Sequence, residues 1–71
     1  MRLDDYPELL TMEEAADVLR ISRSTAYAEA RRFELTGGQQ GLPVVRIGRS
    51  LRAPRDALQR FITSTVGQVQ P

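Results

Sequence analysis

The segment Thr11–Phe33, with the sequence TMEEAADVLRISRSTAYAEARRF, restricts the fold of this chain more than any other feature. Two short stretches with helical spacing meet there at a tight turn. The second stretch opens with Ser-Arg-Ser-Thr and closes with Arg-Arg. The segment therefore predicts a helix-turn-helix motif with a polar and basic second helix.

The first helix is expected to begin after Thr11. Thr11 and Glu14 have the spacing of a capping box, in which each side chain bonds the backbone N–H of the other residue. Acidic residues occupy the solvent face, where the start of a helix favours negative charge. An apolar stripe follows at i, i+3, i+4 and i+7, formed by Met12, Ala15, Ala16 and Leu19.

The turn is predicted at Arg20–Ser22, with Ile21 filling the space between the helices. Ser22 is the expected N-cap of the second helix, which extends from about Arg23 to Phe33. Small inward residues allow this helix to approach the first one closely. The inward stripe consists of Ala26, Ala30 and Phe33, and the opposite side carries Ser24, Ala28 and Arg31.

A glycine-rich segment at 34–41 predicts a mobile loop, and two short strands follow it at 44–47 and 51–53. A two-residue turn at Gly48-Arg49 would mix polar and apolar residues on each face of the hairpin. A three-residue loop at 48–50 instead aligns Ile47 with Leu51 and Arg46 with Arg52. We therefore predict the three-residue loop, with an inner face formed by Val45, Ile47, Leu51 and Ala53.

Pro54 suits the first turn of a third helix, which is expected to continue through Ile62. Its apolar face consists of Ala57, Leu58, Phe61 and Ile62. The predicted fold is mainly α with a small β-hairpin: a winged helix-turn-helix with a two-stranded wing and a C-terminal helix. The domain spans residues 11–62, between an acidic lead-in at 1–10 and a flexible tail at 63–71.

The composition excludes several kinds of function. The chain has no Cys and no His, which excludes disulfides, thiol catalysis and the usual zinc sites. Carboxylates such as Asp4, Asp5 and Glu8 are close in sequence and solvated, so we expect neither an enzyme nor a cofactor. No apolar run has the length of a membrane span and no signal-peptide pattern is present, so a cytoplasmic location without membrane contact is expected.

The formal net charge of +1 hides a strong separation of charge. Residues 1–19 carry a balance of −5, whereas residues 20–71 carry +6. All ten basic residues are Arg, whose planar guanidinium suits phosphate and guanine. A GC-rich genome would also favour Arg codons, so the positions of these residues say more than their number.

Double-stranded DNA is the partner that the motif and the basic charge predict, with the second helix in the major groove and the wing in the minor groove. Arginines on a short hairpin repel one another, and an external anion accounts for them better than folding does. Ala28 is small enough for close approach or contact with a thymine methyl group, and the Tyr27 hydroxyl can bond a phosphate. The alternatives are a solvated basic hairpin and a half-buried Tyr27. The candidate DNA-binding residues are Arg23, Ser24, Thr25, Tyr27, Ala28, Arg31, Arg46, Arg49 and Arg52.

The stretch from Leu9 to Ile62 resembles the MerR-like winged helix-turn-helix domains of small excisionases, also called recombination directionality factors. The residue at position 28 is often basic in that family but is Ala here, and the connection from Phe33 to Pro43 is longer than usual. The resemblance implies DNA contacts by Arg23, Ser24, Thr25 and Tyr27 on the helix, and by Arg46 and Arg49 on the wing. The matching motifs are Leu10-Thr11-Met12-Glu13-Glu14-Ala15-Ala16, Ile21-Ser22-Arg23-Ser24-Thr25, Val45-Arg46-Ile47-Gly48 and Pro54-Arg55.

By this resemblance, the chain is expected to bind neighbouring DNA sites sequence-specifically, bend the DNA and direct an integrase toward excision without catalysis of its own. The separated charges also suit head-to-tail self-association along DNA. Two alternatives stay open. One is a small MerR-like transcriptional regulator with the same DNA chemistry, and the other is a protein-interaction module that uses the scaffold without DNA.

Overall fold

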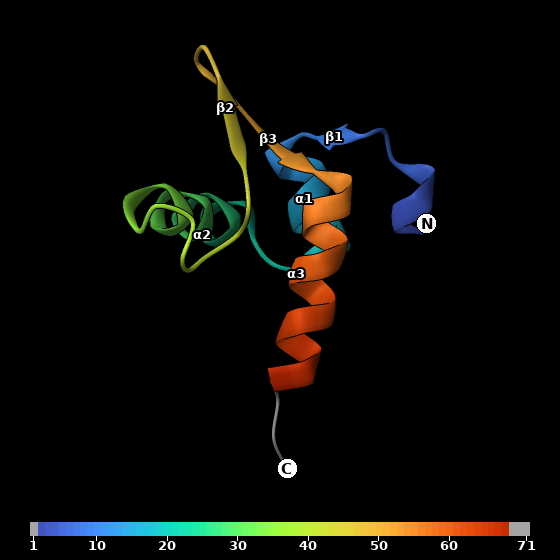
Figure 1. Cartoon of the computed structure of the whole chain (residues 1–71). Coiled ribbons are helices and arrows are strands. Elements are labelled where there is room, and N and C mark those ends of the chain that lie inside the picture. The colour runs from blue at the N-terminus through green and yellow to red at the C-terminus, as the bar shows by residue number, and fades with distance from the viewer. Residues whose placement is uncertain (1, 69–71) are drawn as a thin grey trace.

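The computed structural model describes residues 2–68, which form three α-helices and a three-stranded antiparallel sheet (Figure 1). The predicted order of helical pair, hairpin and third helix is confirmed, and the sheet has one strand more than predicted. In chain order the elements are the 3-10 helix η1 (Leu3–Asp5), β1 (Leu9–Leu10), α1 (Met12–Leu19), α2 (Arg23–Leu35), β2 (Val45–Ile47), β3 (Ser50–Pro54) and α3 (Arg55–Gln68).

Helix α1 is capped by side-chain hydrogen bonds at its start and by backbone hydrogen bonds at its end. The Thr11 hydroxyl accepts a hydrogen bond from Glu14 N (3.1 Å) and the Glu14 carboxylate accepts one from Thr11 N (2.9 Å), which confirms the predicted capping box. After Leu19 the chain turns because Arg20 adopts a left-handed conformation with a φ of 59°. The N–H groups of Arg20 and Ile21 then bond carbonyls of the last turn of the helix, at 3.2 and 3.0 Å.

Small side chains set the distance between α1 and α2. Ala26 and Ala30 on α2 are fully buried, as predicted, and Phe33 is partly buried against the same core. They meet the buried alanines of α1, so the two backbones approach closely. The expectation that Ile21 fills the space between the helices is wrong: its residue is 36% exposed, because alanine packing leaves no space to fill.

The glycine-rich segment after α2, predicted as a mobile loop, folds back onto the helix. Gly37 and Gly38 adopt positive φ values of 64° and 89°, and Gly38 N donates to the Phe33 carbonyl (2.8 Å) to close the helix end. Farther along, Leu42 N donates to the carbonyl of Glu29 in the middle of α2 (3.0 Å). Leu42 is 1% exposed and belongs to the core.

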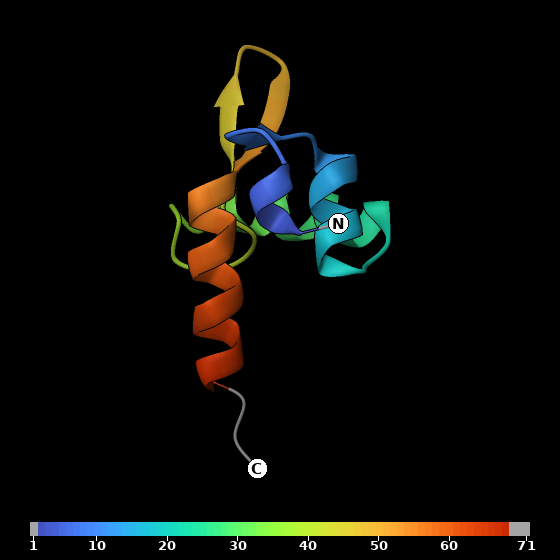
Figure 2. The ribbon, with the colours of Figure 1, turned by 90° about the vertical axis from the view of Figure 1, so that its right-hand side faces the viewer.

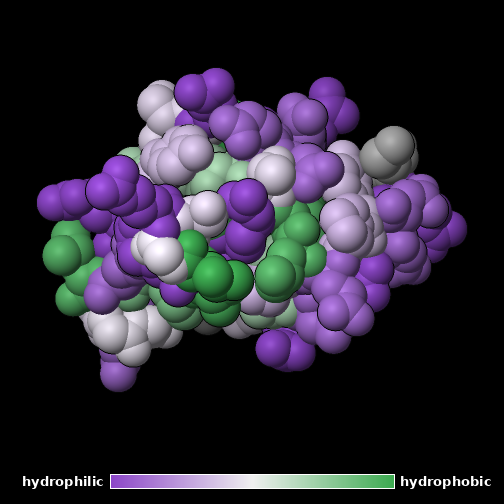
Figure 3. All heavy atoms as spheres, turned by 90° about the horizontal axis from the view of Figure 1, so that it is seen from above, coloured by the Kyte–Doolittle hydropathy of each residue, from purple (hydrophilic) through white to green (hydrophobic). Residues whose placement is uncertain are grey.

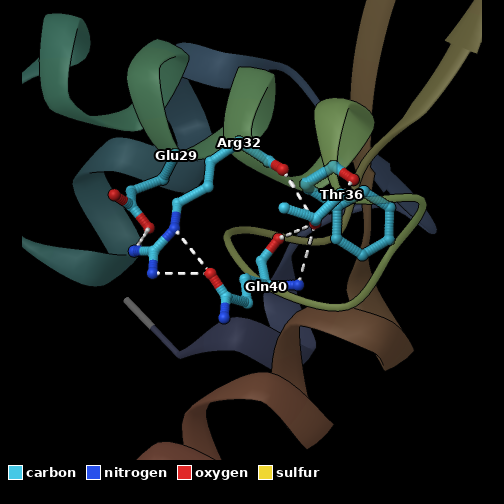
Figure 4. A network of polar contacts seen from close by, with 5 residues as sticks. Glu29, Arg32, Thr36 and Gln40 are labelled. Atoms are coloured by element: carbon cyan, nitrogen blue, oxygen red, sulfur yellow. Dashed lines mark hydrogen bonds and ion pairs between the residues drawn. The ribbon is translucent and has the colours of Figure 1, made fainter.

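Polar side chains hold this returning loop along α2 (Figure 4). Nε and Nη2 of Arg32 both donate to Gln40 Oε1, at 3.2 and 2.8 Å, and Glu29 lies 3.7 Å from Arg32. The Thr36 hydroxyl accepts from Gln40 N (3.0 Å) and donates to the Arg32 carbonyl (2.9 Å). These bonds fix the path of the loop. They add little to stability, because the groups that form them are mostly exposed.

The hairpin of β2 and β3 has a different register from the predicted one. Arg46 lies opposite Leu51 and Ile47 lies opposite Ser50, so only Gly48 and Arg49 form the turn. The predicted three-residue loop is wrong because it would place Ser50 in a left-handed conformation. Gly48 instead adopts a φ of 61° at the first turn position, as a type II′ turn requires.

This register moves the predicted inner residues of β2 to the outer face of the sheet. Val45 and Ile47 are 38% and 59% exposed, whereas Ala53 of β3 is fully buried as predicted. The core position expected for the β2 residues is taken by Leu42 and Val44, which immediately precede the strand and are 1% and 7% exposed. The apolar side of the wing is therefore exposed to solvent.

The predicted acidic lead-in at 1–10 is part of the folded domain over its described residues, 2–10. β1 pairs antiparallel with the last two residues of β3, and Leu10 is fully buried. Arg55, at the start of α3, ties this segment down through its backbone N–H to the Glu8 carbonyl and its Nη1 to the Tyr6 carbonyl, both at 2.7 Å. The sequence pattern does not predict this anchoring role of Arg55.

Helix α3 is longer than predicted. It begins at Arg55 and continues to Gln68, so residues 63–68 are helical and not a flexible tail, while 69–71 lie outside the described residues. Leu58 is fully buried and starts the helix against the core, and extending an existing helix is far easier than nucleating one. The wing and the far end of α3 project in opposite directions (Figure 2).

Because the loop after α2 folds back onto the helix, two glycine substitutions in it should lower the free energy of unfolding by different amounts. Gly41 has a φ of 95°, and a Cβ there would lie 2.4 Å from the Glu29 carbonyl oxygen and 2.7 Å from Phe33 N. Gly37 also has a positive φ, of 64°, but an added Cβ would meet nothing within 4 Å. We expect Gly41→Ala to lower the free energy of unfolding by about 3 kcal/mol or more, and Gly37→Ala by about 1 kcal/mol. Urea unfolding followed by circular dichroism measures both, and equal losses would contradict the close backbone contact.

Candidate nucleic-acid interface

Helix α2 presents a polar and basic surface beside the wing. The side chains recurring at intervals of three or four on the wing side are Arg23, Tyr27, Arg31 and Glu34. Arg32 points to the opposite side and is engaged by the loop. The six residues of α2 predicted to contact DNA are all exposed: Arg23, Ser24, Thr25, Tyr27, Ala28 and Arg31.

The start of α2 is ordered by its predicted cap. The Ser22 hydroxyl accepts from Thr25 N (3.1 Å), which confirms Ser22 as the N-cap, and lies 2.8 Å from the Thr25 hydroxyl. Arg23 lies 3.5 Å from Glu13 of α1, with side chains that are 69% and 53% exposed. A pair this exposed is weak, so the Arg23 guanidinium is accessible to an incoming phosphate.

A bidentate ion pair joins the wing to α2. Nε and Nη2 of Arg46 donate to the two carboxylate oxygens of Glu34, at 2.8 and 2.9 Å. This hydrogen bonding, together with the positive charges of Arg46 and Arg31, holds the pKa of Glu34 below its usual range, while Glu34 raises the pKa of Arg46. The pair therefore connects two elements that are 12 residues apart in the chain.

An open hollow of about 500 Å³ lies between the start of α1, α2 and the wing. Tyr27, whose residue is 42% exposed, lines this hollow from α2. The wing contributes three arginines to the lining: Arg46, Arg49 and Arg52. Glu13 of α1 also lines this hollow, so three arginines and one carboxylate border a concave region next to the exposed side of α2.

The arginines of the wing are not arranged as predicted. Arg46 and Arg52 were expected as outward neighbours, but residue 52 lies opposite Val45, so alternation places the two arginines on different faces. Nη1 of the partly buried Arg52 donates to the neighbouring Leu51 carbonyl (2.8 Å). Arg49 occupies the turn itself and is exposed. The prediction of a single basic face is wrong because it depended on the three-residue loop.

The outer face of the sheet is apolar as well as basic. The exposed apolar side chains there are Leu9 of β1 (42% exposed) and Val45 and Ile47 of β2, and the partly buried Arg52 of β3 lies on the same face. Seen from the wing side, apolar residues form small groups among hydrophilic ones (Figure 3). Ile47, directly before the turn, gives the end of the wing an apolar side chain next to its arginines.

Glu34 is the residue of this surface that the sequence analysis missed. The sequence pattern predicts a helix that ends at Phe33, and thus places position 34 in the glycine-rich loop. The helix continues to Leu35, and Glu34 therefore falls three residues after Arg31 and seven after Tyr27. This helical spacing is the signal that could have revealed it.

A family model described as a helix-turn-helix domain matches residues 9–66, and the chain belongs to this family. The match begins at β1, which agrees with the place of that strand in the sheet. No curated protein and no solved structure matches the chain. Domains of this family bind DNA and are typically not enzymes, so membership implies DNA as the partner. Within residues 2–68, no helix is both long enough and apolar enough to span a bilayer.

The Arg46–Glu34 pair predicts how the pKa of the Glu34 carboxyl should respond to loss of Arg46. Because the folded-state pKa of Glu34 is lowered, the pair stabilises the fold above the ordinary glutamate pKa and loses that effect as the pH falls through the lowered value. We expect the Glu34 carboxyl pKa, measured by NMR titration, to rise toward its usual range in Arg46→Ala. Arg49→Ala removes a charge from the same wing without touching Glu34 and serves as the control. A similar rise in both variants would show that general charge, not the bond, lowers the pKa.

Proposed function

We propose that this domain binds double-stranded DNA sequence-specifically, with α2 in the major groove and the β2–β3 wing in the adjacent minor groove. The observation that carries this proposal is the bond between Arg46 and Glu34, because it shows that the basic wing lies directly beside α2 on one surface. An α-helix fits the major groove, and a basic hairpin beside it reaches the neighbouring minor groove or its phosphates.

In this arrangement, residues at different positions of α2 contact different parts of the DNA. Ser24, Ala28 and Arg31 lie on the most exposed side and approach the base edges. Arg23 and Thr25 at the helix start are placed for phosphate contacts, where backbone N–H groups add to the attraction. Tyr27 stands between the helix and the wing, and its hydroxyl can donate to a phosphate oxygen. On the wing, the proposed contacts come from Arg46, Arg49 and Arg52.

We further propose an excisionase-type architectural role, in which the bound domain directs an integrase toward excision. Separation of charge supports this role. The acid-rich 3-10 helix η1 lies at the opposite side of the molecule from α2 (Figure 1). The side chains of Asp4 in this helix and of Glu8 after it are exposed. These acidic residues therefore stay clear of DNA bound by α2, and in a head-to-tail arrangement they can meet basic residues of a neighbouring copy that lie outside its DNA interface. Regulation of transcription is the competing role, and the same DNA surface serves both.

Selection of binding sites tests the proposed function. Purified protein is mixed with sheared genomic DNA from its own source, and the bound fragments are sequenced. We expect enrichment of tandem, closely spaced sites beside an integrase attachment site, whereas scattered promoter sites would support the regulator. The matched control is the variant Arg23→Ala/Arg49→Ala, for which the salt dependence of log affinity should fall by roughly one for each lost phosphate contact. Equal recovery by both proteins would overturn the DNA-binding proposal.

Head-to-tail assembly predicts a separate effect of charge reversal. The variant Asp4→Lys/Glu8→Lys should reduce cooperative binding to tandem sites and change affinity for a single site by less than about twofold. Asp5 is left intact because its carboxylate accepts a hydrogen bond from Arg2 N (3.1 Å). Gel-shift titrations on one-site and two-site duplexes separate the two quantities. Unchanged cooperativity would exclude this contact between copies.

A further inference from the structure

A carboxylate stands where the proposed interface should be wholly basic. Glu34 lies on the wing side of α2, where it lines a second, smaller hollow together with Tyr27, Arg31 and Arg46. Its side chain is 32% exposed, so an unpaired negative charge there would repel nearby phosphates. The simplest electrostatic expectation is that this residue weakens DNA binding.

The geometry of the bond to Arg46 argues against that expectation. Glu34 takes two of the five guanidinium N–H groups, one on Nε and one on Nη2. Both N–H groups of Nη1 and the second one of Nη2 face away from the carboxylate. That remaining edge has the two-donor geometry that pairs with a phosphate or with O6 and N7 of guanine.

The bond also removes the freedom of a long side chain. An arginine on an exposed strand samples many rotamers, and binding must select one of them. The Glu34 carboxylate comes from a different element, α2, so it holds the guanidinium in a fixed place relative to the rest of the interface. The Arg46 side chain stays 49% exposed in this pair, which leaves it accessible to DNA.

We propose that Glu34 is a positioning residue for DNA recognition, holding Arg46 so that its free edge meets the DNA. This inference rests on the proposed DNA-binding function and goes beyond it, because it assigns a favourable role to an acidic residue. The opposite role, in which Glu34 occupies Arg46 as a phosphate mimic and must be displaced, predicts an effect of opposite sign.

The test compares Glu34→Gln with Glu29→Gln, since both remove one negative charge from α2. Glu29 pairs with Arg32 on the loop side and does not touch the wing. Fluorescence anisotropy is measured with a labelled duplex carrying the selected site and with a scrambled duplex. We expect Glu34→Gln to weaken binding to the selected site by roughly fivefold to tenfold, with a smaller loss on the scrambled duplex. Glu29→Gln should leave both affinities unchanged or slightly higher.

A second comparison distinguishes positioning from a merely structural effect. In an Arg46→Ala background, Glu34→Gln should no longer weaken binding, because no guanidinium remains to be held. Arg46→Lys keeps the charge but not the two-pronged bond, and should lose affinity as Glu34→Gln does. The Arg46 Nε–H signal in NMR spectra should lose its distinct shift in Glu34→Gln.

The outcomes separate the two proposals. Failure of the wild-type protein to bind any duplex would overturn both the function and this inference. Tight wild-type binding with equal or tighter binding by Glu34→Gln would leave the function intact and overturn the positioning role. A loss of affinity that persists in the Arg46→Ala background would also overturn it, because the loss would then come from the fold of α2.

Discussion

Strand β3 is the element on which the rest of the domain depends. It pairs with β1 on one edge and β2 on the other, contacts α1, and continues directly into α3. Ala53 near its end is fully buried, and this strand therefore fixes the wing relative to the helical pair. The position of the wing beside α2 follows from this arrangement, because β2 has no other strand to pair with in the described sheet.

The two sides of α2 are used for different purposes. On one side, Glu29 and Arg32 hold the returning loop, which delivers Leu42 to the core. On the other side, Glu34 reaches the wing through Arg46. Both sides use pairs of acidic and basic residues that are too exposed to contribute much stability. Their contribution is to geometry, since they determine where flexible parts of the chain lie relative to the helix.

Local patterns predicted the parts of this fold that depend on near neighbours. The capping box at Thr11, the N-cap at Ser22 and the alanine stripe of α2 all follow from side chains within a few positions of one another. Two features missed by the sequence patterns depend on distant contacts: β1 needs β3 to form a strand, and Glu34 needs Arg46 to become part of the site. The wing register depended on one backbone choice, and the alternation of apolar residues indicated the wrong turn. The predicted residues of α2 are exposed as a recognition surface requires, whereas their contacts with DNA stay predictions.

The type II′ turn at Gly48-Arg49 has a consequence for how domains of this kind can vary in length. Each residue inserted into one strand of the wing exchanges the faces of everything beyond it, which would carry Arg46 away from Glu34. Insertions are therefore compatible with this interface only when they add residues in matched pairs across the hairpin. The chain between Gly38 and Gly41 is under no such rule: Gln40 bonds Arg32 and Thr36, but no strand pairing fixes a register there. Length variation among related domains should accordingly gather in that loop, and the wing should vary in steps of two.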